Sequence, residues 1–124
     1  MPTKELNIRL KRAYEPPTAE DGMRVLVDRL WPRGVGKTEA AIDRWLKEVA
    51  PSSELRRWFG HDPRKWGEFR KKYEVELSGR GDLVRELRQA AQEGPLTLVY
   101  SARDQEHNQA VALRDVLRGT SPDE

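Results

Sequence analysis

Two short segments contain most of the side chains that could bind an anion or move a proton. Each segment follows an apolar run, and together they contain the candidates Asp28, Arg29, Arg33, Arg103, Asp104, His107 and Asn108. Arginine carries a permanent charge on a planar group that matches the oxygens of phosphate and carboxylate. The sequence therefore predicts that Arg29, Arg33 and Arg103 hold a small anion.

The remaining candidates supply the other groups that such a site would use. Asp104 and His107 can exchange protons near neutral pH, so we expect them to act as the catalytic acid–base pair. Asp28 would orient an arginine, and Asn108 would contact the ligand. The chain has no cysteine and no dinucleotide-binding glycine fingerprint. The predicted chemistry is therefore hydrolysis or group transfer on a phosphate-bearing or nucleotide-like molecule, with no cofactor.

The charged residues also have a structural interpretation. Oppositely charged side chains on adjacent loops often form ion pairs that fix the loops rather than bind a ligand. In that case Asp28 would pair with Arg103, or Arg29 with Asp104.

Several other polar and aromatic residues near the two segments have two interpretations. Asn108 could cap a helix, which is the ordinary use of asparagine at such a position, and His107 could pack or cap at the same helix start. Trp31 fits either a core position or a stacking platform. His61 and Asp62 are most simply capping residues between two helices.

The segment DRLWPRGVGKT, residues 28–38, ends in Gly-Lys-Thr like a phosphate-binding P-loop. A P-loop would place its first glycine where this chain has Trp31, and the following Pro32 has no amide hydrogen to donate. The last apolar run also lacks the expected magnesium-binding aspartate directly at its end. The segment is therefore not predicted to be a P-loop, and Thr38 is predicted to cap a helix.

Hydrophobic periodicity predicts the secondary structure. It predicts strands over residues 6–14, 23–30 and 96–102, and helices over residues 39–49, 53–59, 63–77, 83–94 and 107–117. A long helical crossover between apolar strands favours parallel pairing. We predict an α/β fold: a small single-domain sandwich with a short, mostly parallel sheet of about three strands flanked by helices. Ligands bind outside the carboxyl ends of such strands, so the two polar segments should face each other.

The predicted helices contain a set of aromatic residues at core spacing: Trp45, Trp58, Trp66, Phe69 and Tyr73. The basic run at residues 64–72 interleaves aromatics with charges, as single-stranded nucleic-acid sites do. Helical spacing turns those aromatics inward, however, and predicts a solvated charged face. Residues 119–124 are predicted to form a frayed tail of the single domain that spans residues 1–124.

Composition limits the classes of function. The 124 residues include 23 basic and 21 acidic side chains with interleaved signs, so a nucleic-acid partner is not implied. With two histidines and no cysteine the chain is a poor candidate for a zinc or iron site, which leaves carboxylate-bound magnesium open. No segment approaches the roughly 20 apolar residues of a membrane span. We therefore expect a cytoplasmic protein with no membrane partner.

Two non-catalytic alternatives stay open at this stage. The chain could be a module that binds nucleic acid or a regulatory partner, or the charged loops could form a homodimer interface. The sequence does not determine the oligomeric state.

Three sequence blocks resemble the YeaO-like family of small proteins, a domain of unknown function. They are DRLWPRG at residues 28–34, APS-x-ELR-x-WF-x-HDP at residues 50–63 and ARD-x-x-HN at residues 102–108. The resemblance extends from about residue 7 to residue 118. It implies a compact single-domain α/β fold, and it implies no activity, substrate or catalytic residue.

Overall fold

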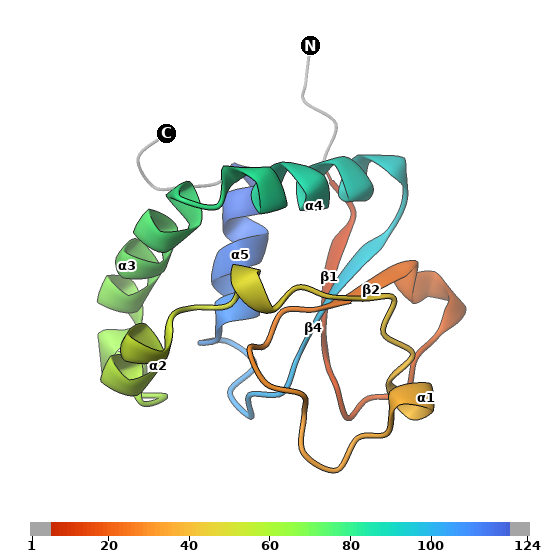
Figure 1. The fold of residues 1–124 in the computed structure, drawn as a ribbon, viewed down its shortest axis with the longest axis horizontal. Coiled ribbons are helices and arrows are strands. Elements are labelled where there is room, and N and C mark those ends of the chain that lie inside the picture. The colour runs from red at the N-terminus through yellow and green to blue at the C-terminus, as the bar shows by residue number, and fades with distance from the viewer. Residues whose placement is uncertain (1–5, 120–124) are drawn as a thin grey trace.

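A four-stranded parallel sheet forms the centre of the fold (Figure 1). The computed structural model describes residues 6–119. The strands are β1 (Ile8–Arg12), β2 (Met23–Leu26), β3 (Arg44–Trp45) and β4 (Leu96–Tyr100), in the order β1-β4-β2-β3. All three pairings are parallel, which confirms the predicted α/β class. The sheet has one strand more than the three predicted, because β3 lies inside a predicted helix.

Strand β4 lies between the first two strands of the chain. It pairs with β1 through Ile8 and Leu96 and with β2 through Met23 and Leu96, so β1 and β2 do not pair with each other. Every residue of β4 is buried. A strand with neighbours on both sides and covered faces is expected to be continuously apolar, as Leu-Thr-Leu-Val-Tyr nearly is.

Helices occupy most of the crossover between β2 and β4, and one follows β4. They are α1 (Lys37–Ala40), α2 (Ser53–Phe59), α3 (Trp66–Ser78), α4 (Gly81–Glu93) and α5 (Gln109–Arg118). Three short 3-10 turns are η1 (Ala19–Asp21), η2 (Lys47–Val49) and η3 (Pro63–Lys65). Ser52 and Asp62 cap helical segments, because their side chains accept hydrogen bonds from the backbone N–H groups of Leu55 and Arg64. This confirms the predicted cap at Asp62. Gly60 ends α2 in the left-handed conformation.

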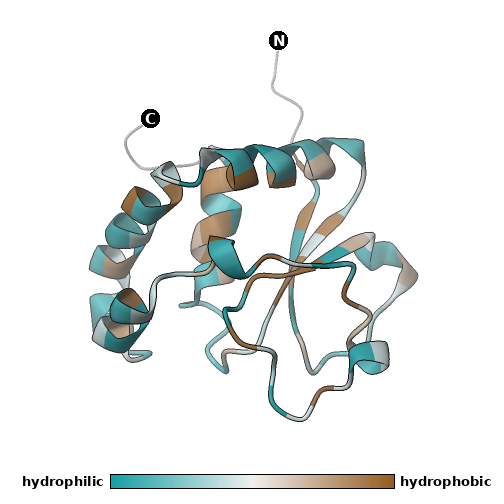
Figure 2. Ribbon diagram, in the orientation of Figure 1, coloured by the Kyte–Doolittle hydropathy of each residue, from teal (hydrophilic) through white to brown (hydrophobic). Residues whose placement is uncertain are grey.

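The two faces of the sheet are covered differently. Val25 and Val27 of the β2 segment, with Leu98 of β4, pack against the helices in the larger hydrophobic cluster. Leu26 and Val99 point to the opposite face, because successive side chains of a strand alternate. That face is covered by the segment between β2 and β3 rather than by a long helix (Figure 1). In Figure 2, hydrophobic and hydrophilic residues alternate along α3, as expected for a helix with one buried side.

The predicted helix over residues 39–49 is wrong. Helix α1 ends after four residues, with Ala41 in the left-handed conformation (φ 49°). The chain then runs beside β2: Asp43 N–H donates to the Arg24 carbonyl (2.9 Å) and Leu46 N–H to the Leu26 carbonyl (3.0 Å). Pairing with a buried strand therefore overrides the helical spacing of the segment. Thr38 is also not a cap, since it lies inside α1.

The predicted aromatic core is largely present. Phe69 and Tyr73 are buried, and Trp58 and Trp66 are partly buried against the same cluster. Trp45 belongs instead to the small cluster on the opposite face of the sheet.

A buried ion cluster supports the start of β2. The Asp21 carboxylate lies 2.7 Å from the Arg24 guanidinium and 3.1 Å from the Lys11 ammonium. It also accepts hydrogen bonds from the backbone N–H and hydroxyl of Thr18 (3.0 Å each). Next to it, Gly22 has a positive φ of 62° and its Cα is so close to Pro95 that an added Cβ would lie 2.2 Å from the Pro95 carbonyl oxygen.

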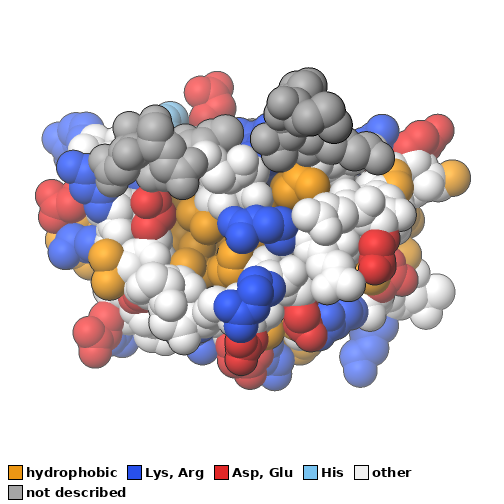
Figure 3. Space-filling view, turned by 90° about the horizontal axis from the view of Figure 1, so that it is seen from above, with side chains coloured by type: hydrophobic (Ala, Val, Ile, Leu, Met, Phe, Trp, Pro, Cys, Tyr) orange, Lys and Arg blue, Asp and Glu red, His pale blue; other side chains and the backbone are white. Residues whose placement is uncertain are grey.

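The surface is mixed in charge. Figure 3 shows basic and acidic side chains interspersed across the face seen from above. Across residues 6–119, none of the helices is long and apolar enough to cross a membrane. Of the predicted tail, Gly119 ends α5 in the left-handed conformation. The rest of the tail, residues 120–124, lies outside the described part of the chain.

Candidate functional site

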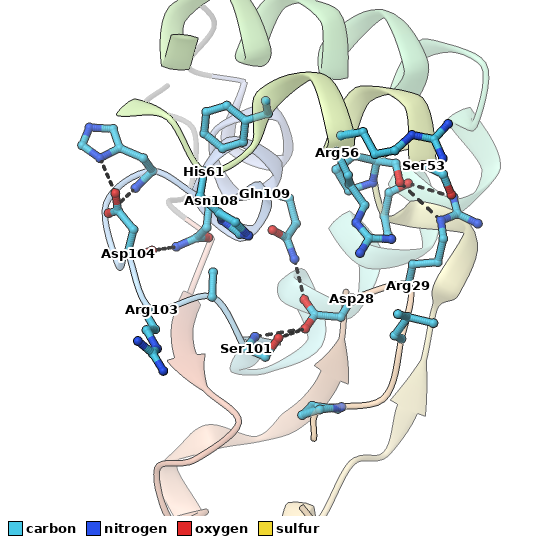
Figure 4. A pocket seen from close by; sticks show the side chains of 18 of the residues that line it. Asp28, Arg29, Ser53, Arg56, His61, Ser101, Arg103, Asp104, Asn108 and Gln109 are labelled. Atoms are coloured by element: carbon cyan, nitrogen blue, oxygen red, sulfur yellow. Dashed lines mark hydrogen bonds and ion pairs between the residues drawn. The ribbon is translucent and has the colours of Figure 1, made fainter. Parts of the chain in front are cut away.

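A pocket of about 970 Å³ lies at the carboxyl ends of β2 and β4 (Figure 4). It is lined by the segment after β2, the loop between β4 and α5, and residues 50–61 around α2. The two polar segments therefore face each other, as the parallel sheet predicted.

Asp28 forms the floor of this pocket and joins the two segments. Its carboxylate accepts hydrogen bonds from the backbone N–H (3.0 Å) and the hydroxyl (2.6 Å) of Ser101. Gln109, the first residue of α5, donates a third hydrogen bond from its side chain. Asp28 is 8% exposed, and this burial raises the pKa of its carboxyl group above the usual value, although the hydrogen bonds act in the opposite direction. Among the described residues Asp28 makes no hydrogen bond or ion pair with an arginine, although Arg56 attracts its charge. The role of Asp28 in orienting an arginine therefore stays a prediction.

Five arginines line the pocket: Arg29, Arg33, Arg56, Arg57 and Arg103. Only Arg29 makes a side-chain hydrogen bond to another described residue, donating to the Pro51 carbonyl (3.3 Å) and the Ala50 carbonyl (3.5 Å). Among residues 6–119 the other four make no side-chain hydrogen bond or ion pair. The cross-loop ion pairs of Asp28 with Arg103 and of Arg29 with Asp104 are therefore not formed within this part of the chain.

The segment before α2 is held rigidly beside the pocket. The Ala50 carbonyl accepts a hydrogen bond from Arg80 (2.7 Å), and the Val49 carbonyl accepts one from Tyr73. Glu76 accepts hydrogen bonds from both the backbone N–H (2.8 Å) and the hydroxyl (2.6 Å) of Ser52. These contacts from α3 and its end fix the position at which α2 presents its arginines.

Asp104 and His107 are in direct contact, and their catalytic role stays a prediction. His107 Nδ1 lies 2.9 Å from Asp104 Oδ2, and both side chains are about one-third exposed. Hydrogen bonds from the backbone N–H of Glu106 and from His107 lower the pKa of Asp104. The imidazole also packs edge-on against Trp66, with ring centroids 5.4 Å apart. The geometry thus fits both a proton-transfer pair and a packed residue at a helix start.

Asn108 is a helix cap. Its side-chain oxygen accepts a hydrogen bond from Val111 N–H (3.1 Å), and its side-chain nitrogen donates to the Asp104 carbonyl (2.9 Å). It is 2% exposed. Asn108 lines the pocket, but both of its polar atoms are engaged in the fold.

Sequence reasoning missed Arg56, Arg57, His61 and Gln109 as pocket residues. The adjacent arginines lie on α2, where a charged pair is normally solvated, and nothing local indicates that this helix borders the strand ends. His61 was expected to cap a helix, yet Asp62 alone does so. His61 itself has a positive φ of 57°, an uncommon backbone conformation for a residue with a side chain.

Metal ligands are sparse. Within the described residues no group of three or more His, Asp or Glu side chains could hold a metal ion. The pocket lining combines permanent positive charge on several walls with hydrogen-bonding groups on the floor.

Comparison with known proteins gives the family but no activity. The model of a family described as the inactive DUF488-N3 subclade matches residues 7–123. The uncharacterised protein YeaO of Escherichia coli K12 is 45% identical over 113 residues, which cover 91% of this chain and 98% of that protein. The uncharacterised protein Mb3100c of Mycobacterium bovis is 39% identical over 116 residues, which cover 94% and 98%. No solved structure matches the chain. The chain belongs to the YeaO-like proteins of the DUF488-N3 subclade, whose function is uncharacterised.

Proposed function

We propose that this protein binds a small anionic, phosphate-bearing ligand in the pocket at the carboxyl ends of β2 and β4. The observation that carries the proposal is the set of five arginines, from three separate segments, around one pocket that contains only two aspartates. Arginine stays charged at any physiological pH and matches phosphate oxygens with paired N–H donors.

The positive charge of the five pocket arginines is only partly offset by the two pocket aspartates. Asp28 takes its hydrogen bonds from Ser101 and Gln109, and Asp104 takes its hydrogen bonds from its own loop. Four arginines are therefore left without a side-chain hydrogen bond or ion pair to any other described residue. A bound anion would offset their mutual repulsion, which supports a ligand site over a structural ion-pair network.

Binding without chemistry is the simpler form of the proposal. The family model describes its subclade as inactive. Among the pocket hydroxyls, that of Ser101 donates to Asp28 and not to His107, so it is not aligned with the base that nucleophilic catalysis would need. A hydrolase or transferase is a second candidate, and the 2.9 Å contact between His107 and Asp104 is the observation that favours it. A cytoplasmic location also stays a prediction.

Thermal unfolding with phosphate, sulfate and organic phosphates would test anion binding. A ligand at 100 times its dissociation constant stabilises the fold by about 2.7 kcal/mol. We expect such a shift for at least one phosphate compound and its loss in Arg56→Ala and Arg103→Ala. Arg85→Ala is the matched control, because Arg85 lies on α4 away from the pocket lining.

The outcome separates the candidates. Identical shifts in Arg56→Ala, Arg103→Ala and Arg85→Ala, or no shift with any anion, would contradict the proposal. Turnover of a bound compound that disappears in His107→Ala, with binding retained, would favour the enzyme.

A further inference from the structure

We propose that the ligand is a nucleotide, whose base lies against an apolar wall formed by Tyr14, Leu30 and Trp31 and whose phosphate lies against the pocket arginines. This inference rests on the anion site proposed above and adds the chemical class of the ligand. Four features of the pocket carry it: exposed apolar surface, fixed aromatic rings, a carboxylate floor and the volume of the pocket.

Two exposed apolar side chains lie at this pocket. Among the described residues, four large hydrophobic side chains are exposed: Tyr14, Met23, Leu30 and Val75. Tyr14 (49% exposed) and Leu30 (66% exposed) both line the pocket beside the arginines. Apolar surface left open to water in a concave site marks a place where an apolar group of a ligand binds.

The aromatic rings of this wall are held in place by their polar atoms. The Tyr14 hydroxyl donates to the Arg33 carbonyl (3.1 Å), and the Arg12 guanidinium lies 5.0 Å from the Tyr14 ring centroid. Trp31 donates its indole N–H to the Val35 carbonyl (2.6 Å). A ring already fixed in one orientation loses little conformational entropy when a flat base packs against it.

The Asp28 carboxylate at the floor of the pocket favours the hydroxyl groups of a sugar over a second anionic group. Figure 4 shows Arg29 and Arg56 on one side of Asp28 and Arg103 on the other. A carboxylate accepts hydrogen bonds from hydroxyl groups and repels phosphate. A phosphate would therefore lie against one arginine wall, and the hydroxyls of an attached sugar would face Asp28.

The size of the pocket agrees with a ligand larger than a bare ion. Its volume of about 970 Å³ is at the upper end of the range for small-molecule and cofactor sites. Inorganic phosphate would contact the arginines and leave the apolar wall exposed.

Calorimetric titration of the full chain with AMP, GMP, ribose 5-phosphate, inorganic phosphate and adenosine tests the inference. Stacking of a base on a protein surface is sequence-tolerant, so we expect both nucleotides to bind at least about tenfold more tightly than ribose 5-phosphate. Leu30→Ala should weaken AMP binding and leave ribose 5-phosphate binding unchanged. Val75→Ala is the matched control, because Val75 is 72% exposed and lies outside the pocket lining. Arg103→Ala should weaken AMP and ribose 5-phosphate alike.

Each outcome has a distinct meaning. Equal affinities for AMP, ribose 5-phosphate and phosphate would overturn the nucleotide inference and leave the anion site standing. Failure of every phosphate compound would overturn both. The nucleotide could be free or could be the 5′ end of a nucleic acid, and a dinucleotide with a 5′-phosphate distinguishes the two. Tighter binding of the dinucleotide than of AMP would identify a nucleic-acid end as the ligand. Weaker binding would identify a free nucleotide.

Discussion

The Asp28 carboxylate accepts hydrogen bonds from both the backbone N–H and the hydroxyl of Ser101, so that the ends of β2 and β4 are joined by one buried side chain. The same carboxylate therefore stabilises the fold and forms the floor of the pocket. A substitution of Asp28 should alter both the free energy of unfolding and the affinity for a ligand, and the change in the free energy of unfolding should depend on pH.

We expect the stability difference between Asp28→Asn and the natural chain to depend on pH. Burial raises the pKa of folded Asp28 above the usual 3.8. The folded protein thus binds a proton at the Asp28 carboxyl group more tightly than the unfolded chain does. This difference stabilises the folded state fully below about pH 4, and the stabilisation is lost as pH rises through the pKa of the folded state. Relative to the natural chain, Asp28→Asn should accordingly have its most favourable free energy of unfolding at neutral pH and its least favourable near pH 4. Urea unfolding from pH 4 to pH 8 measures this, with the exposed Asp82→Asn as control.

Asp28→Asn should also strengthen binding of inorganic phosphate. The substitution removes a negative charge from a pocket with five arginines, and one unit of charge at short range changes affinity by several-fold or more. Titration with phosphate at pH 7 and low salt is the measurement. An unchanged or weaker affinity would show that phosphate does not approach the floor of the pocket.

Asp21→Asn should destabilise the protein at neutral pH and have a smaller effect in acid. Burial alone would raise the pKa of Asp21, but hydrogen bonds from Thr18, Lys11 and Arg24 outweigh it and lower the pKa to about 2. The stability from the ionised group is complete above about pH 4 and is lost as pH falls towards pH 2. We expect a loss of about 2 kcal/mol at pH 7 that shrinks in acid. A pH-independent loss would mean that packing, and not charge, is the cause.

Gly22→Ala should be among the most disruptive single changes. The added Cβ would lie 2.2 Å from the Pro95 carbonyl oxygen, at a φ of 62°. We expect a loss of more than about 2 kcal/mol, since a positive φ alone costs an alanine about 1–3 kcal/mol and the close contact adds to that. Gly34→Ala is the matched control, because Gly34 has a φ of 78° and no neighbouring atom within 4 Å of the added Cβ. Equal losses in the two variants, measured by thermal unfolding, would show that the contact with Pro95 is unimportant.

Asn108→Ala should cost about 1 kcal/mol through loss of the α5 cap. Asn108→Ser should recover much of that stability, because a serine hydroxyl can accept the same hydrogen bond. Ligand affinity per folded molecule should change little in either variant if Asn108 is only a cap. A loss of affinity in both variants would restore the ligand-contact role that the sequence first suggested.

Local features of the fold were predictable from the sequence, and non-local ones were not. The helix starts after Ser52 and Asn108 follow from a cap and the residues just beyond it. The segment after α1 has helical spacing, but the hydrogen bonds of Asp43 and Leu46 to β2 decide its structure. Those partners lie about 20 residues away and leave no local trace in the sequence.

The same distinction applies to the site. Because ligands bind at the carboxyl ends of parallel strands, the sequence alone predicts that Asp28 and the loop after β4 lie close together. Arg56 and Arg57 were missed because their place depends on how α3 holds the segment before α2, through Tyr73 and Glu76. Hydrogen bonds among distant side chains cannot be inferred from spacing alone.

The central position of β4 also has a consequence for how the chain reaches its native state. Ile8 and Leu96 are neighbours in the sheet but 88 positions apart in the chain. While the chain emerges from the ribosome, β1 has no strand to pair with until β4 is made. Pairing at such long range slows folding and prolongs exposure of unpaired strand edges. Strand β4 and the loop and helix α5 that follow it therefore complete both the sheet and the arginine pocket at its edge.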